Sequence, residues 1–393
     1  KDLDTFFDYP LSKETFKLNK TLGENLADTI PNPSESKAKI AKAISFREYL
    51  EALVGKKLER AFFNKYPEKV WGIPTDEMLP DWAPKRVRIT NKRETFFNGQ
   101  YCAIANSGTG SIFRRIKKEC ETLGSLFLMD TEILNLKCAD SSIQSIQFKN
   151  YQLDLKEDSN IVSTLPITII SDWLGVKIRL NYRGVLSTYF ANSQKKNYIP
   201  NDYCWLYFQD DQYSFNRITE PTKMCNSLCL DKYQSNINYL IAETTFGVEK
   251  NIIPWEYINE LKNKNLKDIL ALPWIDSSLG FSSSHNIEPY VYPIQDHNYK
   301  LEYKRALLSL SKITNLSLLG ASSEFQYSDM QIIFRKSKDF IEDLIKKKGK
   351  DTLSISRNSF EERRKLQDRS FSTSLSLRPK VIVEIGINHN GSM

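Results

Sequence analysis

The stretch EKVWGIPTDEMLPDWAPKR, residues 68–86, places two tryptophans and three prolines within nineteen positions. Its apolar residues follow neither the period of a helix nor that of a strand, and large aromatic side chains normally find buried surface. The composition therefore predicts a packed loop rather than a linker. Two roles fit such a loop: it closes one side of a helical bundle, which the composition favours, or it covers a flat ligand.

The segments on either side of this loop differ in their hydrophobic period. Residues 35–66 carry apolar side chains at helical spacing, and Gly55 is expected to separate two helices. From residue 125 the pattern alternates and is punctuated by turns, as in an antiparallel meander. Helices around a strand-rich middle predict an α+β fold with interleaved domains. We expect further strands in 183–191, 203–208, 213–219, 238–246 and 315–322, and helices in 254–265, 300–312 and 327–348.

The overall composition is that of a globular protein. Of the 393 residues, 40% are hydrophobic and 12% aromatic, enough to bury a core. No apolar run approaches the roughly 20 residues of a membrane helix, and no secretory leader is present. The six scattered cysteines predict a reduced, cytoplasmic protein. The close pair Cys225 and Cys229 lacks the partner ligands of a zinc site, so no metal is expected.

The net charge of +7 is concentrated in residues 346–380, whereas residues 1–345 are close to neutral. A nearly neutral body does not favour a surface that follows a phosphate backbone, so no nucleic-acid partner is expected. We interpret the basic segment as a solvated linker rather than a binding arm.

The glycine-rich stretch NSGTGSIFRRI, residues 106–116, precedes an expected helix. The dinucleotide fingerprint requires a third glycine where this sequence has Phe113. A turn at Gly108 and Gly110 that lets backbone approach a ligand fits better than a pyrophosphate cradle. The three histidines form no metal motif, and no GxSxG is present. The residues alone therefore predict an α+β protein with a planar or sugar ligand.

Residues 66–86, YPEKVWGIPTDEMLPDWAPKR, resemble the signature stretch of flavin-dependent amine-oxidase-like proteins. The resemblance is strongest to the protoporphyrinogen-oxidase-like and UDP-galactopyranose-mutase-like flavoproteins. It implies FAD as cofactor and a small-molecule substrate, for example a nucleotide sugar. Six further stretches match the family in order along the chain: FFDYPL, NSGTGSIFRRI, NIVSTLPI, WLYFQDDQYSFNRITEP, YVYPIQDHNY and LSLLGASSEFQYSDMQ.

The family resemblance also implies a division into domains. It predicts an incomplete FAD/NAD(P)-binding Rossmann-like domain, a small helical domain and an antiparallel β-sheet substrate domain. The FAD-binding remnant is expected in residues 1–18, 91–124, 155–175 and 313–345. The helical domain is expected in 19–90, and the sheet domain in 125–154 and 176–312.

Candidate site residues follow from the same resemblance. On the substrate side it implies Trp71, Arg86, Arg217 and Tyr299, and on the flavin side Gly108, Gly110, Thr164, Gly320 and Met330. Structural alternatives stay open for each of them. Trp71 or Tyr299 could belong to a core, the two arginines could form surface ion pairs, and the glycines could be turns. No catalytic residue is implied, and the sequence does not choose between oxidase and mutase chemistry.

Two departures from the family pattern concern cofactor binding. The family's N-terminal βαβ unit with GxGxxG does not occur in this sequence, and the segment that usually reads GRxGxF is GASSEF at 320–325. In flavoproteins the protein supplies binding and orientation, and a helix N-terminus stabilises the pyrophosphate. We therefore expect this chain alone to bind FAD weakly.

The last residues carry a second resemblance. PKVIVEIGINHNGSM, residues 379–393, is similar to the opening strand of N-acetylneuraminate synthase and its relatives. It implies that residues 381–393 form the first strand of a synthase-like TIM barrel. Together the two resemblances imply a partial reading frame of surface-polysaccharide or nonulosonic acid metabolism. The leading hypothesis is a truncated FAD-dependent oxidoreductase or UDP-sugar mutase. A non-catalytic binding remnant and a fragment fused to a synthase are the alternatives, and the oligomeric state stays open.

Overall fold

The computed structural model describes residues 6–7, 9–14, 26–81, 87, 90–92, 108–194, 196–225, 228, 238–348 and 381–383. The chain forms two compact units. The first comprises residues 1–127 and 179–303, and the second comprises residues 128–178 and 304–393. No helix within the described ranges is both long and apolar enough to cross a membrane.

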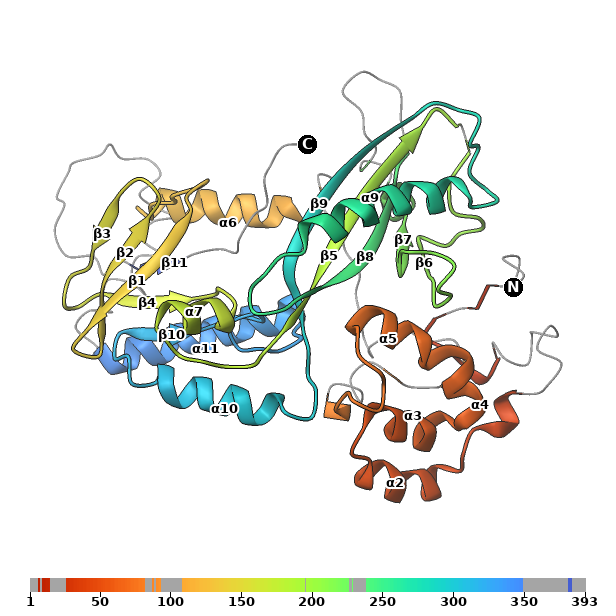
Figure 1. Cartoon of the computed structure of the whole chain (residues 1–393), viewed down its shortest axis with the longest axis horizontal. Coiled ribbons are helices and arrows are strands. Elements are labelled where there is room, and N and C mark those ends of the chain that lie inside the picture. The colour runs from red at the N-terminus through yellow and green to blue at the C-terminus, as the bar shows by residue number, and fades with distance from the viewer. Residues whose placement is uncertain are drawn as a thin grey trace, which may run out of the picture. The chain divides into compact units, whose positions relative to one another are not determined.

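The helical part of the first unit follows the short 3-10 helix η2 (Leu26–Thr29). Its elements are α2 (Pro33–Lys42), α3 (Phe46–Val54), α4 (Lys56–Leu58), the π-helical segment η3 (Glu59–Phe63) and α5 (Lys65–Trp71) (Figure 1). Ser45 caps α3, because Glu48 N–H donates to Ser45 Oγ at 3.2 Å, and the Glu48 carboxylate accepts at 2.9 Å from the N–H of Ile44, the residue before the cap. Gly55 ends α3 with φ +84°, and a Cβ there would lie 2.6 Å from the Thr29 carbonyl oxygen. The predicted break at Gly55 is confirmed.

The core of this helical part also includes the Trp/Pro loop. Phe46, Leu50 and Leu58 are fully buried, and Trp71 and Met78 pack with them. The loop therefore contributes to the core of the bundle, as the first of the two predicted roles requires. Residues 82–86 lie outside the described part of the chain.

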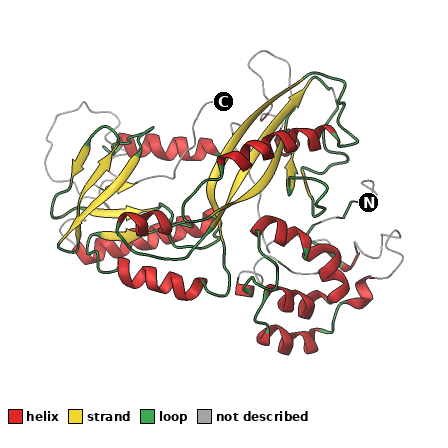
Figure 2. Cartoon of the chain, viewed as in Figure 1, coloured by secondary structure: helices red, strands yellow, loops and turns green. Residues whose placement is uncertain are grey.

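The first unit also contains a five-stranded antiparallel sheet of order β6-β7-β8-β5-β9. Its strands are β5 (Tyr182–Asn192), β6 (Trp205–Tyr207), β7 (Arg217–Thr219), β8 (Leu240–Val248) and β9 (Phe281–Pro293). The short α8 (Pro221–Met224) follows β7, and α9 (Trp255–Leu270) lies across one face of the sheet (Figure 2). Phe190, Leu240 and Ala242 form the core on that face with Ile269 of α9.

The strands and helices expected along this unit are largely confirmed, but one strand is shorter than predicted and one was not predicted. The strand expected in 213–219 is confined to 217–219. The thirteen-residue β9 was not predicted. Its first four residues, FSSS, are exposed at the edge of the sheet and carry three serines, so the alternation that signals a half-buried strand is missing.

The second unit contains two small sheets. The antiparallel meander consists of β1 (Ile133–Ala139), β2 (Ser142–Phe148) and β3 (Gln152–Asp154). The parallel sheet has the order β10-β4-β11, with β4 (Asn160–Ser163), β10 (Leu316–Leu318) and β11 (Val381–Val383). The helices are α7 (Ile167–Trp173) and α11 (Met330–Lys348), and the unit boundary falls within α10 (Tyr299–Leu310). The predicted approach of 160–166 and 315–345 is confirmed, because Leu316 pairs with Ile161.

The expectation that 125–154 and 176–312 share one antiparallel sheet is wrong. The meander forms its own sheet in the second unit. The Asn315 side chain joins it to the start of β10, accepting a hydrogen bond from Ile143 N–H and donating one to the Ile143 carbonyl, both at 2.9 Å. Alternation indicated strands in both regions, apart from β9, but it does not indicate which strands pair.

The structure covers only part of the predictions for the C-terminal residues. Residues 349–380, most of the expected basic linker, and residues 384–393 lie outside the described ranges. Val381–Val383 pair in parallel with β4, where Ile382 lies opposite Ile161. These three residues therefore pair within the second unit, while their origin in a synthase-like barrel stays a prediction.

Candidate functional site

The face of the five-stranded sheet opposite to α9 carries the candidate site. Thr244 of β8 points toward α9, because its hydroxyl donates to Asn265 at 2.8 Å. Neighbouring side chains of a strand point to opposite faces, so Glu243 lies on the other face. Arg217 of β7 is its direct cross-strand partner. The register of β7 and β8 therefore places this charged pair on the face away from α9.

Arg217 and Glu243 form an ion pair in which Arg217 Nε donates to a Glu243 carboxylate oxygen. Burial alone would lower the pKa of Arg217, but the hydrogen bond and the charge of Glu243 outweigh it and raise that pKa. The guanidinium thus stays charged at any ordinary pH. The Arg217 side chain is 37% exposed, so part of its fork remains accessible beside the ion pair.

Three tyrosines from separate elements surround this pair. Tyr66 comes from α5, Tyr207 from β6 and Tyr292 from β9, and the rings of Tyr66 and Tyr207 meet edge to face at 5.1 Å. Burial, together with Tyr207 and Tyr292, raises the pKa of Tyr66 well above its usual value, while Arg217 opposes this shift. Tyr66 therefore keeps its hydroxyl proton. We call these five residues, Tyr66, Tyr207, Arg217, Glu243 and Tyr292, the Arg217 cluster.

The cluster suits a ligand that combines an anionic group with a planar ring. A guanidinium presents five donors in a planar fork that matches phosphate and carboxylate oxygens. The exposed Tyr207 ring, at 37%, offers an amphipathic surface for a flat group. Because the pKa values of Tyr66 and Arg217 are both raised, these two groups keep their protons at neutral pH, which suits binding rather than proton transfer.

The structure separates the sequence-predicted substrate residues. Arg217 belongs to the cluster, and Trp71 packs beside it with its ring 5.4 Å from that of Tyr292. Trp71 is only 7% exposed, so it acts as a core residue behind the site. Tyr299 donates its hydroxyl proton to Asp81 at 3.1 Å, and burial and Asp81 raise its pKa to about 12. Arg86 lies outside the described residues.

Sequence reasoning missed four members of the cluster: Tyr66, Tyr207, Glu243 and Tyr292. Three of them lie in stretches that carried the family resemblance, so a signal existed for Tyr66 in YPEKVWGIPTDEMLPDWAPKR, Tyr207 in WLYFQDDQYSFNRITEP and Tyr292 in YVYPIQDHNY. No comparable signal marks Glu243, because its role depends on the β7–β8 register.

The predicted flavin-side residues fall into both units. Gly108 and Gly110 lie in the first unit at the start of α6 (Gly110–Thr122), where Gly108 adopts φ +78°. Thr164 and Gly320 come together in the second unit at the carboxyl ends of the parallel strands β4 and β10, and a Cβ on Gly320 would lie 3.8 Å from Thr164 Cβ. Met330 is the first residue of α11.

The described part of the second unit does not fit the pyrophosphate of FAD. The Gly320 N–H, with φ +107° at that residue, donates to the Glu324 carboxylate at 3.1 Å, and Glu324 pairs with Lys336. The first N–H of α7, from Ile167, donates to the Ser322 carbonyl. These two N–H donors are thus already bonded within the protein. Thr164 and Gly320 lie at the carboxyl ends of the parallel strands, the end of such sheets at which nucleotides bind, but the Gly320 N–H is not available to a phosphate.

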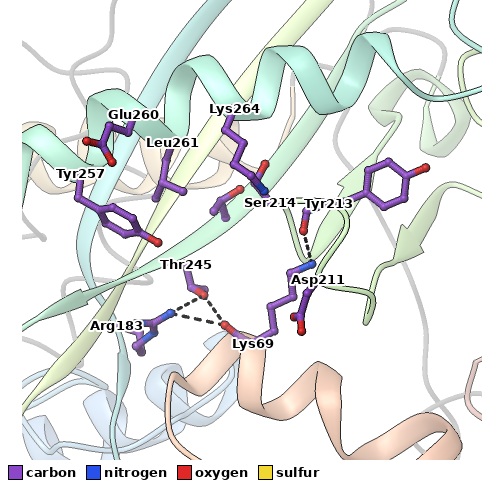
Figure 3. Close-up of a pocket in the computed structure, with 11 residues that line it drawn as sticks. Lys69, Arg183, Asp211, Tyr213, Ser214, Thr245, Tyr257, Glu260, Leu261 and Lys264 are labelled. Atoms are coloured by element: carbon purple, nitrogen blue, oxygen red, sulfur yellow. Dashed lines mark hydrogen bonds between the residues drawn. The ribbon is translucent and has the colours of Figure 1, made fainter.

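A cavity of about 420 Å³ lies beside α5, β8 and α9 in the first unit (Figure 3). Lys69 and Arg183 line it, yet both point their donors at backbone rather than into open space. Lys69 Nζ donates to three carbonyl oxygens, and Arg183 donates to the end of α5. Its other lining residues are Asp211, Tyr213, Ser214, Thr244, Thr245, Tyr257, Glu260, Leu261 and Lys264.

The fold is shared by other solved structures. One is described as reduced UDP-galactopyranose mutase, with a TM-score of 0.54 and 16% identity over 75% of this chain and 66% of that chain. Another is a putative protoporphyrinogen oxidase from Exiguobacterium sp. 255-15, with a TM-score of 0.57 and 14% identity over 83% of this chain and 75% of that chain. This chain therefore spans just under two thirds of the mutase, and the likeness establishes the fold.

The fold and sequence place the chain in the class of FAD-dependent, amine-oxidase-like flavoproteins. The profile of the UDP-galactopyranose mutase family matches residues 61–270, which is more than half of the chain. The chain belongs to this family, whose cofactor is FAD. The predicted resemblance is confirmed, although no curated protein matches the chain. The match does not reach residues 379–393, so the synthase-like strand stays a prediction.

Proposed function

We propose that this protein binds a nucleotide sugar at the Arg217 cluster, as a UDP-sugar mutase-like or oxidoreductase-like member of its family. The observation that carries the proposal is the partly exposed guanidinium of Arg217 among three tyrosines on the face away from α9. In this arrangement Arg217 binds the diphosphate, and the exposed ring of Tyr207 packs against a planar part of the ligand.

Glu243 gives the proposal a distinctive electrostatic signature. Its carboxylate competes with a ligand anion for the Arg217 guanidinium. Removing the arginine should weaken binding, whereas neutralising the glutamate should strengthen it. If the ion pair only stabilised the fold, substitutions of Arg217 and Glu243 would not change ligand affinity in opposite directions.

The experiment is a calorimetric titration of the chain with UDP-galactopyranose. We expect Arg217→Gln to weaken binding by about tenfold to a hundredfold, the loss of a charge-assisted hydrogen bond. Glu243→Gln should bind more tightly than the unmodified chain. Arg60→Gln, an exposed arginine of the same unit, is the matched control and should leave binding unchanged.

Two results would reject the proposal. One is the absence of binding by the unmodified chain, and the other is equal affinity of the Arg217→Gln and Arg60→Gln variants. Thermal unfolding of each variant identifies a loss of binding that results from a loss of folding.

We further propose a role in the metabolism of cell-surface polysaccharide or nonulosonic acid. The nucleotide-sugar chemistry of the mutase family supports it. In this proposal the five-stranded sheet of the first unit, with Arg217, binds the substrate. Product analysis after incubation with UDP-galactopyranose and reduced FAD tests the redox-neutral mutase reaction, and the same incubation with oxidised FAD, which can accept a hydride, tests the oxidase reaction. Recovery of unchanged substrate would reject both.

A further inference from the structure

The Arg217 cluster is built from elements that are distant in sequence. Tyr66 lies on α5, whereas Tyr207 lies on β6, and their rings must stay in contact at 5.1 Å. Helix α5 has only seven residues, too few to be stable by itself. Some interaction must therefore fix this helix relative to the end of β6.

Lys69 of α5 makes this connection. Its ammonium donates hydrogen bonds to the carbonyl oxygens of Tyr213 at 2.6 Å, Asp210 at 2.9 Å and Phe208 at 3.5 Å. Phe208 directly follows Tyr207, so these acceptors belong to the segment that joins β6 to β7. Three donors thus meet three acceptors from one loop, and they bind the helix to the strand that carries Tyr207.

The charge state of Lys69 is compatible with this role. Burial lowers the pKa of Lys69 to about 8, and the carboxylate of Asp211 opposes the shift. The amine therefore keeps its proton, and with it all three donors, at neutral pH. No carboxylate lies within ion-pair distance of Lys69 among the described residues, so its partners are the loop carbonyls.

The other side of the same helical turn is fixed by the sheet. Arg183 of β5 donates to the Val70 carbonyl at 3.2 Å and to Thr245 Oγ1 at 3.0 Å, and Thr245 donates to the Lys69 carbonyl at 2.8 Å (Figure 3). These bonds satisfy carbonyls that the end of a helix leaves unpaired. Gly72, at φ +70°, ends the helix where a Cβ would lie 2.7 Å from the Arg183 guanidinium.

We propose that Lys69 is a positioning residue that holds α5 against the β6–β7 segment and so sets the Tyr66–Tyr207 geometry of the nucleotide-sugar site. Arg183 and Thr245 support it by fixing the last turn of α5. The inference rests on the proposed function for its effect on ligand binding. Its effect on the two rings is independent of any ligand.

The test compares Lys69→Met with Lys65→Met. Lys65 lies on the same helix, but its exposed side chain pairs only at 3.4 Å with Glu68 in the same turn. The first readout is the nuclear Overhauser effect between the Tyr66 and Tyr207 rings. We expect Lys69→Met to abolish it and Lys65→Met to retain it. Lys69→Arg should restore it, because a guanidinium can also donate to several carbonyls.

The second readout is the affinity for UDP-galactopyranose. We expect Lys69→Met to weaken the affinity about tenfold, because this is the upper range for the net contribution of one hydrogen bond. The affinity of Lys65→Met should equal that of the unmodified chain. If Lys69→Met does not fold, Lys69→Gln, which removes the charge but keeps an amide donor, replaces it.

The two ideas fail in different ways. A retained ring contact in Lys69→Met, or in Lys69→Gln when the first variant does not fold, overturns the positioning role. An abolished contact supports that role even if the unmodified chain binds no UDP-galactopyranose, in which case the proposed function alone fails. Unchanged affinity of the folded Lys69→Met variant, when the unmodified chain binds UDP-galactopyranose, also overturns the inference.

Discussion

The buried polar network beneath α9 gives a quantitative test of which sheet face is covered. Asn265 of α9 is fully buried and donates to Thr188 Oγ1 at 2.9 Å. Its side-chain oxygen accepts from Thr244 at 2.8 Å and from Ser214 at 2.7 Å. Asn265→Ala removes the bonds with Thr188 and Thr244, and also the Ser214 contact, although the single Ser214 hydroxyl proton can instead be donated to Asp268 at 2.6 Å. At about 1 kcal/mol each, the expected loss of unfolding free energy is about 2–3 kcal/mol.

Asn259→Ala is the matched control for this change. Asn259 lies on the same helix and is exposed, with its side chain bonded only to nearby Lys262 at 3.2 Å. Both substitutions gain the same helix propensity, so the difference between the two variants isolates the network. The free energy of unfolding of the Asn259→Ala control should lie within about 0.5 kcal/mol of that of the unmodified chain.

The assay is urea unfolding followed by circular dichroism, supported by thermal unfolding. A loss of about 2–3 kcal/mol lowers Tm by about 4–12 °C for a unit of this size. If Asn265→Ala and Asn259→Ala unfold at the same urea concentration, the network does not anchor α9. The assignment of Arg217 and Glu243 to the face away from α9 would then lose its main support.

Two further predictions concern pH and cofactor. Burial, with Lys262, lowers the pKa of His285, so below about pH 6.5 the unfolded chain takes up a proton before the folded chain does. The free energy of unfolding should thus be independent of this group above pH 6.5 and should decrease below it. His285→Gln should reduce this decrease, whereas the exposed control His297→Gln should not. Equal dependence of the unfolding free energy on pH in the two variants would contradict the reasoning. The purified chain should be colourless, because the Gly320 N–H is already bonded to Glu324; stoichiometric flavin absorbance would show that the remaining contacts suffice.

The sequence predicted local structure better than pairing. Gly55, the helix over 254–265 and the strand over 183–191 carried clear signals of period and punctuation, and the structure has elements at each place. The separation of 133–154 into its own sheet depends on long-range partners such as Asn315, which periodicity does not report.

The candidate site was predictable only in part. Arg217 came from a family resemblance, but its importance depends on Glu243, which lies opposite it only because of the β7–β8 register. Trp71 attracted attention because it is large and rare, and the same property drives it into the core. Lys69 gave no signal, since its partners are backbone carbonyls and these leave no trace in side-chain patterns.

The central claim is that a nucleotide sugar binds on the face away from α9, and the ring signals of labelled tyrosines test it most directly. During titration with UDP-galactopyranose, the account predicts shifts for Tyr66, Tyr207 and Tyr292 and none for Tyr213 and Tyr257, which line the cavity beside α9. Shifts confined to Tyr213 and Tyr257, or no shift in any tyrosine, would contradict it.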